Sequence, residues 1–200
     1  IMKRRLSLLI AGLCTLSMAL RAQTSADSAT IVSTRWETTV AQDGTIHKRA
    51  LIPSLYKGPQ HINIIEIPAS RTLHYGIGVN EKMVPISQLS AENQALASIN
   101  GSFYNMQKGN SVCYLKLGKE VVDTTTTREF KLRVTGAVYT HKKKLRIIPW
   151  SRETEAKYKK KKGNVLASGP LLMDDGHTCS WEMCDSSFIA TKHPRSAIFT

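Results

Sequence analysis

Short apolar runs of strand length recur from His61 onward, and turn residues separate them. A β-branched run over 62–67 ends at Pro68, and 72–79 follows as a second run, which predicts a β-hairpin. Asp174-Asp175-Gly176 has the composition of a tight turn. Further strands are expected at 111–117, 120–123, 130–139, 145–148 and 165–173.

One stretch alone has the spacing of an amphipathic helix. Apolar residues recur after Pro85 at helical intervals as far as Ser98, with Ser87 as the expected cap. Many short strands around one clear helix favour the α+β class over a parallel doubly wound sheet. We therefore expect a strand-rich mixed sheet packed on one main helix in a single domain.

The amino terminus has the layout of a secretory signal peptide. Basic residues at 3–5 precede an apolar run over 6–20, and a small polar stretch follows Ala22. This run is short for a spanning helix, and a buried first helix fits the basic head less well. We expect residues 2–22 to be a signal peptide, with the mature protein periplasmic, in the cell envelope or extracellular and without a stable membrane span.

The remaining chain divides by composition into two parts. Residues 23–60 are rich in Thr, Ser and Ala with few sustained apolar periods, and they are expected to form an irregular leading segment. Residues 61–200 hold the expected strands and helix. They are therefore expected to form the folded domain.

The formal charge of +13 is local rather than global. Ten of the basic residues lie in 141–162 against Glu153 and Glu155, and four lie in 1–22. The lysines of 141–162 are interpreted as a solvated strand edge. The alternative is a docking patch for an anionic glycan. Nucleic acid is not an expected partner, because export would separate the chain from it and aromatic residues do not alternate with the lysines.

Export leaves three cysteines in a compartment that tolerates disulfides. Cys179 and Cys184 enclose four residues, so they are the candidate disulfide, and Cys113 would be unpaired. These two cysteines could instead join His177 and His193 in a zinc site, but their spacing fits no tight metal signature. No metal and no cofactor is therefore expected.

Three segments taken together resemble the phosphodiester glycosidase family. Residues 97–105 read Ala-Ser-Ile-Asn-Gly-Ser-Phe-Tyr-Asn, 167–172 read Ala-Ser-Gly-Pro-Leu-Leu, and 193–198 read His-Pro-Arg-Ser-Ala-Ile. The family includes the domain of the enzyme that uncovers mannose 6-phosphate by removing N-acetylglucosamine from a phosphodiester. The resemblance implies a glycoside hydrolase that is exported and hydrolyses a sugar 1-phosphodiester of the N-acetylglucosamine-1-phosphodiester type.

The chain departs from the family pattern at identifiable positions. Ser102 and Tyr104 replace a glycine and an aromatic residue of the first segment, and Ser196 and Phe199 replace a threonine and a glycine of the third. The family's later Asp-Gly-Gly-Gly-Ser turn would lie beyond Thr200. The resemblance thus implies a C-terminally truncated, bacterial-type member in which 61–200 are the N-terminal part of the domain.

The same segments supply the candidate site residues. Arg195 is expected to bind the phosphate, because a planar guanidinium fork suits two phosphate oxygens. Asn100 would position sugar or phosphate beside the amides of Gly101 and Ser102, and His193 could transfer a proton. Two further candidates follow from the second segment: Ser168 as a hydrogen-bond donor and Gly169 as a point where the backbone can approach the ligand closely.

Each candidate also has an ordinary structural interpretation. Asn100-Gly101 is a common turn, and Arg195 could be a surface arginine at a strand end. No carboxylate of 1–200 lies in a motif that marks it as catalytic. The competing functions are a non-catalytic envelope protein that binds anionic glycan through the lysines of 141–162, and a disulfide- or metal-stabilised interaction domain. The further prediction from this resemblance is that Asn100 and Arg195 meet in one concave site.

Overall fold

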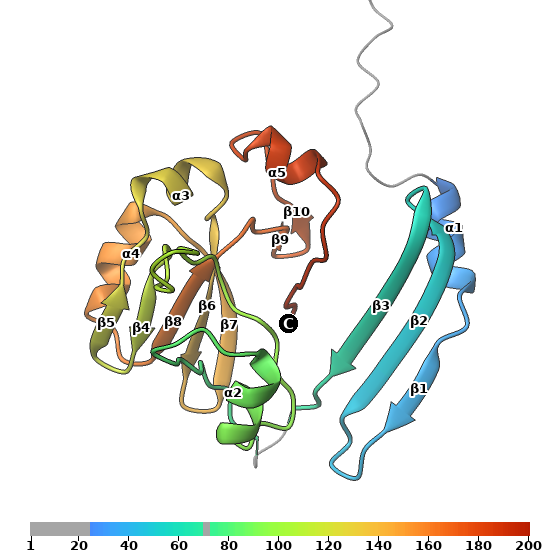
Figure 1. Cartoon of the computed structure of the whole chain (residues 1–200), viewed down its shortest axis with the longest axis horizontal. Coiled ribbons are helices and arrows are strands. Elements are labelled where there is room, and N and C mark those ends of the chain that lie inside the picture. The colour runs from blue at the N-terminus through green and yellow to red at the C-terminus, as the bar shows by residue number, and fades with distance from the viewer. Residues whose placement is uncertain (1–24, 70–72) are drawn as a thin grey trace, which may run out of the picture. The chain divides into compact units, whose positions relative to one another are not determined.

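The computed structural model describes residues 25–69 and 73–200, and the chain divides into two compact units, Ile1–Pro68 and Ala69–Thr200. The first unit contains helix α1 (Ser25–Ser33) and a three-stranded antiparallel sheet in the order β1-β2-β3 (Figure 1). Its strands are β1 (Glu37–Val40), β2 (Ile46–Leu55) and β3 (Gly58–Glu66).

The prediction of an irregular leading segment over 23–60 was therefore wrong. β2 pairs with β3 over most of its length, for example Arg49 with Asn63. The hairpin turn between them uses Tyr56 and Lys57, which both have positive φ, 52° and 62°. Tight two-residue turns need this conformation and usually obtain it with Asn-Gly, and Tyr56-Lys57 is therefore not recognisable as a turn from its residue types. The predicted partner of β3, 72–79, contains no strand among its described residues.

The second unit has a five-stranded sheet in the order β5-β4-β8-β6-β7, and every pairing in it is antiparallel. The α+β class is confirmed, whereas the expected mixed sheet is antiparallel. The elements of this unit are α2 (Ile86–Glu92), β4 (Leu115–Leu117), β5 (Glu120–Asp123), α3 (Thr127–Leu132), β6 (Gly136–His141), β7 (Lys144–Pro149), α4 (Arg152–Lys159), β8 (Asn164–Ser168), β9 (Met173–Asp174), β10 (His177–Thr178) and α5 (Ser186–Ala190).

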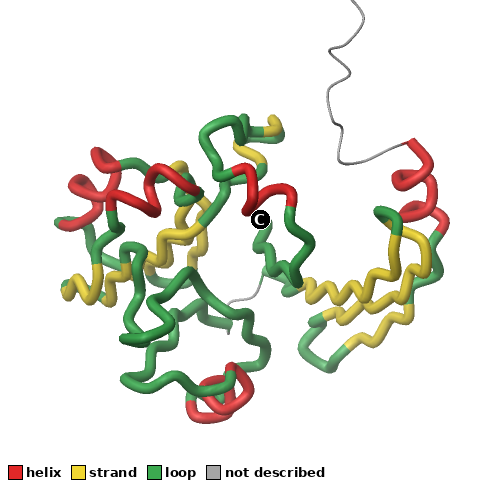
Figure 2. Tube along the Cα trace, turned by 45° about the horizontal axis from the view of Figure 1, so that its top comes forward, coloured by secondary structure: helices red, strands yellow, loops and turns green. Residues whose placement is uncertain are grey.

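Three predicted elements are shorter than their sequence patterns. The strand expected at 111–117 is reduced to Leu115–Leu117. The helix expected from Pro85 to Ser98 ends at Glu92, because Gln94 adopts a left-handed conformation with φ of 49°. Most of 93–114 is loop (Figure 2). The strand expected at 165–173 stops at Ser168, where a cis Gly169–Pro170 peptide follows. The turn expected at 174–176 is confirmed as the β9–β10 hairpin.

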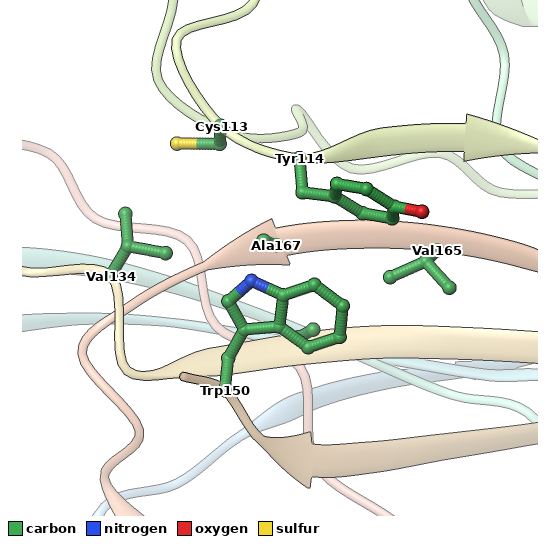
Figure 3. Packing of buried hydrophobic residues seen from close by; sticks show 7 residues of the cluster. Cys113, Tyr114, Val134, Trp150, Val165 and Ala167 are labelled. Atoms are coloured by element: carbon green, nitrogen blue, oxygen red, sulfur yellow. The ribbon is translucent and has the colours of Figure 1, made fainter. Parts of the chain in front are cut away.

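The core of the second unit lies on one face of the five-stranded sheet. Residues of β6 and β8 that pair across the sheet, Ala137 with Ala167 and Tyr139 with Val165, point to this face because strand side chains alternate. Trp150 covers them, and its ring lies 5.3 Å from that of Tyr114 (Figure 3). Partly buried aromatics from α3 and α4, Phe130 and Tyr158, complete the cluster. This packing fixes α3 relative to the sheet.

None of the helices in residues 25–69 and 73–200 is both long and apolar enough to cross a membrane. The predicted signal peptide at 2–22 lies outside the described residues.

Candidate functional site

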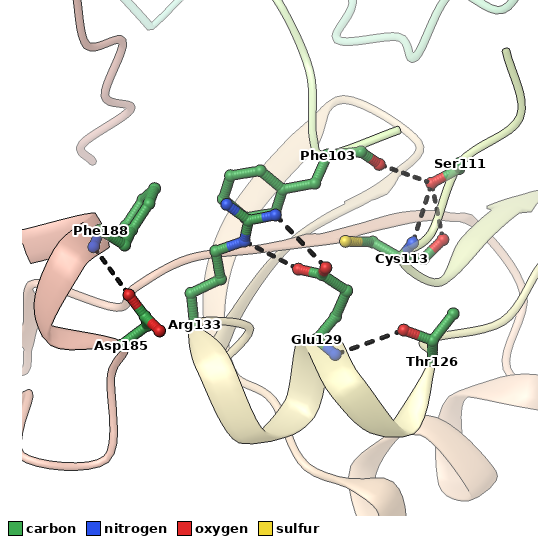
Figure 4. A network of polar contacts seen from close by, with 8 residues as sticks. All are labelled: Phe103, Ser111, Cys113, Thr126, Glu129, Arg133, Asp185 and Phe188. Atoms are coloured by element: carbon green, nitrogen blue, oxygen red, sulfur yellow. Dashed lines mark hydrogen bonds and ion pairs between the residues drawn. The ribbon is translucent and has the colours of Figure 1, made fainter. Parts of the chain in front are cut away.

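A short helix, α3, carries the most organised polar cluster of the second unit. Thr126 caps α3 by accepting a hydrogen bond from the amide of Glu129. Glu129 then accepts two hydrogen bonds from the guanidinium of Arg133, at 2.8 and 3.3 Å (Figure 4). The Glu129 side chain is only 7% exposed and that of Arg133 25%. A buried carboxylate of this kind needs its cation, so the pair fixes the position of the guanidinium.

Two phenylalanine rings flank this guanidinium. The Arg133 Cζ lies 3.7 Å from the ring centroid of Phe103 and 5.1 Å from that of Phe188. The two rings also contact each other edge to face, with centroids 5.8 Å apart. Because aromatic faces attract cations, Arg133 links helix α5 to the loop that contains Phe103.

Gly169, in the second family-like segment, lies against the backbone of Arg133. A Cβ atom on Gly169 would lie 2.0 Å from the carbonyl oxygen of Arg133 and 2.9 Å from the amide nitrogen of Thr135. Only glycine fits this contact. Gly169 was predicted to let backbone approach a ligand; the close approach in the structure is instead to the chain leaving α3.

Asp185 is the N-cap of helix α5. Its carboxylate accepts hydrogen bonds from the amide of Phe188, at 2.9 Å, and from the hydroxyl of Ser187. The Ser187 hydroxyl, followed by the Phe188 amide, lowers the pKa of Asp185 below its ordinary value. The Asp185 amide donates to the carbonyl of Leu132. These bonds hold α5 against the end of α3.

A pocket of about 250 Å³ lies between α3, α5 and the chain after α5. This is slightly below the range of about 300–1,000 Å³ of drug-sized ligand sites, so it suits a small polar group. Its lining holds two guanidinium groups, of Arg128 and of the Glu129-paired Arg133, together with the His193 imidazole and the Asp185 carboxylate. The lining residues are Arg128, Leu132, Arg133, Asp185, Ser187, Phe188, Thr191 and His193. The pocket is suited to an anion.

Arg195 borders this pocket without lining it. Its Nη2 donates to the carbonyls of Phe188, at 2.8 Å, and Thr191, at 3.1 Å, and its Cζ lies 4.4 Å from the Phe188 ring centroid. Arg195 therefore satisfies carbonyls at the end of α5. The prediction from the sequence was that Arg195 binds the phosphate.

Asn100 meets the third motif segment through Ser196. The Ser196 hydroxyl donates to Asn100 Oδ1 at 2.6 Å. Of the sequence-predicted candidates, only His193 lines the pocket. The others, Asn100, Gly101, Ser102, Ser168, Gly169 and Arg195, lie outside its lining.

The cysteines differ from expectation. Cys113, Cys179 and Cys184 are all free, so the candidate disulfide between Cys179 and Cys184 is not formed. Cys184 is instead buried in the turn before α5, where its amide donates to the carbonyl of Trp181. Burial raises the pKa of its thiol. The zinc alternative gains no support either, since the described residues contain no cluster of three or more His, Cys, Asp or Glu side chains fit for a metal ion.

Cys113 is fully buried beside the Arg133 cluster. Burial raises the pKa of its thiol, and the neighbouring Ser102 side chain partly opposes this change. Among the described residues the buried Ser102 hydroxyl forms no hydrogen bond with an oxygen or nitrogen atom. Ser102 therefore packs against the core, which leaves its predicted ligand role without a structural counterpart.

Sequence reasoning missed Arg128, Arg133, Asp185 and Phe188. It assigned 130–139 to one strand, which placed Arg133 in the middle of a sheet. A signal was present in Thr126-x-x-Glu129, the pattern of a helix start. Phe188 had no such signal, because its role depends on contact with Arg133, which is distant in sequence.

No family model, no curated protein and no solved structure matches this chain.

Proposed function

We propose that this protein is a glycosidase of the phosphodiester type, which hydrolyses a sugar 1-phosphodiester, and that the pocket between α3 and α5 binds the phosphate. The observation that carries this proposal is the convergence of all three family-like segments on one pair of side chains, Arg133 and Phe188. Phe103 of the first segment contacts both of them. Gly169 of the second abuts Arg133, and Arg195 of the third stacks on Phe188.

The charge of the pocket supports a phosphate ligand. Arg128 is exposed and has a full set of guanidinium donors, whereas Arg133 is oriented by its bonds to Glu129. One guanidinium group can donate hydrogen bonds to two phosphate oxygens at once, which makes it suited to a phosphodiester. In this proposal Arg195 holds α5 in place and does not itself bind the phosphate.

The reaction needs few groups from the protein. Water attacks the anomeric carbon, the bond from that carbon to the phosphate oxygen breaks, and the phosphomonoester leaves with the bonding electrons. Because a phosphate leaves readily, cations that stabilise its charge contribute more than an acid that protonates it. Asp185 and His193 are the pocket residues able to orient the water or accept its proton.

The experiment measures how fast the full-length protein releases N-acetylglucosamine from its methyl 1-phosphodiester. Arg128→Gln removes charge-assisted hydrogen bonds worth about 1.5–3 kcal/mol each, so turnover should fall at least about tenfold. Arg128 makes no hydrogen bond or ion pair within the described residues, so the variant should fold. Arg146→Gln, an exposed arginine on β7, is the matched control.

Two results would refute the proposal. The first is an absence of hydrolysis by the wild-type protein. The second is equal turnover by Arg128→Gln and Arg146→Gln, because an anion in the pocket must interact with Arg128.

A further inference from the structure

Three turns at one end of the five-stranded sheet carry a dense group of lysines. They are the β4–β5 turn, the β6–β7 turn and the loop from α4 to β8 (Figure 1). We define the lysine-rich end as Lys119, Lys142, Lys143, Lys144, Lys159, Lys160, Lys161 and Lys162, all of them exposed. Glu120 is the only acid in these turns.

The sheet brings these turns together from distant parts of the sequence. Thr140 of β6 pairs with Asn164 of β8, which sets the β6–β7 turn beside the loop that enters β8. The side chain of Asn164 then accepts a hydrogen bond from the amide of Gly118, at 2.8 Å, which adds the β4–β5 turn. The lysines therefore form one surface.

A buried lysine holds the surface together. Lys116 is fully buried, and its Nζ donates to the carbonyls of Gly118, at 2.8 Å, Gly163, at 3.1 Å, and Lys161. Three carbonyl partners satisfy the three donors of an ammonium group. Lys116 thus joins the β4–β5 turn to the loop before β8 and adds a positive charge beneath the exposed lysines.

Other contacts fix the same loop against β6. The Tyr139 hydroxyl donates to the carbonyl of Lys162 at 2.9 Å, and the Lys161 ammonium lies 4.0 Å from the Tyr158 ring centroid. A Cβ atom on Gly163 would lie 2.4 Å from the carbonyl oxygen of Thr140. The lysines are therefore presented on a fixed backbone.

Protection of a sheet edge accounts for only part of this arrangement. The edge strands are β5 and β7, whereas Lys159 to Lys162 lie beyond the end of the central strand β8. No exposed carboxylate pairs with Lys119, Lys160 or Lys162 among the described residues. Like charges held close together repel one another, so a surface of this kind is stabilised by an anion that spans several of them.

We propose that the lysine-rich end docks an anionic polymer with repeating phosphate groups. Lysine ammonium groups bind phosphate as point charges without a fixed geometry, which suits a flexible polymer. A lipid surface fits less well, because no large apolar residue is exposed within 118–120, 142–144 or 159–163 to enter a membrane. This docking does not depend on the glycosidase activity proposed for the pocket beside α3.

The test uses binding of fluorescent polyphosphate to the whole protein. The variant Lys119→Gln, Lys144→Gln, Lys160→Gln removes one charge from each turn. The control Lys82→Gln, Lys108→Gln, Lys131→Gln removes the same net charge from exposed positions elsewhere. The first variant should weaken binding at least about tenfold and make its salt dependence shallower, whereas the control should change affinity less than about twofold.

Three outcomes would overturn the proposal. Equal losses in both triple variants would mean that net charge alone drives binding. Equal affinity for polyglutamate would mean that phosphate is not recognised. Tighter binding to vesicles rich in phosphatidylglycerol would identify a lipid surface as the partner. Matching thermal unfolding of the two variants excludes misfolding as the cause of a difference.

Discussion

Ser196 donates a hydrogen bond to the side-chain oxygen of Asn100 at 2.6 Å across 96 positions of sequence. It is the direct contact between the first and third family-like segments. Asn100 and Ser196 are both exposed, so the bond is made in competition with water. Its contribution can be measured, because each partner has a simple truncation.

A double-mutant cycle should detect this bond. Asn100→Ala and Ser196→Ala should each destabilise the protein, with a coupling energy of about 0.5–1 kcal/mol in urea unfolding. The control cycle combines Asn100→Ala with Arg195→Ala, since Arg195 bonds to the carbonyls of Phe188 and Thr191 instead. Coupling that is equally large in the control cycle would contradict the geometry.

Gly169 should tolerate no side chain. A Cβ atom would lie 2.0 Å from the Arg133 carbonyl oxygen, so Gly169→Ala must displace backbone and should destabilise the protein by about 3 kcal/mol or more. Gly76→Ala is the control, because its Cβ would meet no atom within 4 Å. It should change stability by less than about 1 kcal/mol. Similar urea midpoints for the two variants would count against the close contact.

The Asp-Asp-Gly turn and the strand at 120–123 were predictable because their signals are local. The hairpin of β2 and β3 was not, since its turn residues, Tyr56 and Lys57, adopt a conformation that their side chains do not favour. The alternating burial of β2 and β3 agrees with strand geometry, but the Thr-rich context of 23–60 concealed it.

The candidate site was only partly predictable for a different reason. His193 was found because it lies in a recognisable segment. Arg133 gains its importance from Glu129, Phe103 and Phe188, and only the fold brings these side chains together. The segments that suggested the resemblance contribute only His193 to the pocket lining, whereas the cations of the pocket depend on how α3 and α5 pack.

The three described cysteines should differ in reactivity. Burial raises the pKa of the Cys113 and Cys184 thiols, so less thiolate is present to react at a given pH. Cys179 is partly exposed. Iodoacetamide should therefore label Cys179 first and Cys113 last in the folded protein, as read by peptide mass spectrometry.

Denaturation provides the control for this order. All three cysteines should then react at similar rates, because they are free in the structure. If Cys179 and Cys184 stay unlabelled after denaturation without reductant, the two are joined by the disulfide that their spacing permits.

Asp185 should titrate below an ordinary aspartate. The Ser187 hydroxyl lowers the pKa of the Asp185 carboxyl most, and the Phe188 amide adds to this effect. A carboxylate whose pKa is lower in the folded than in the unfolded state stabilises the protein at pH values above its unfolded pKa. This stabilisation is lost as the pH falls through the folded pKa. Acid should therefore loosen α5 and the pocket wall that it forms.

The measurement is the carboxyl carbon shift of Asp185 followed by NMR through acid pH. Ser187→Ala removes the main cause, so the Asp185 pKa should rise toward its ordinary value of 3.8. Ser186→Ala is the control, because the Asp185 carboxylate accepts its hydrogen bonds from Ser187 and Phe188 and not from the Ser186 hydroxyl. An Asp185 pKa that is the same in both variants would show that the Ser187 hydroxyl does not stabilise the carboxylate at the start of α5.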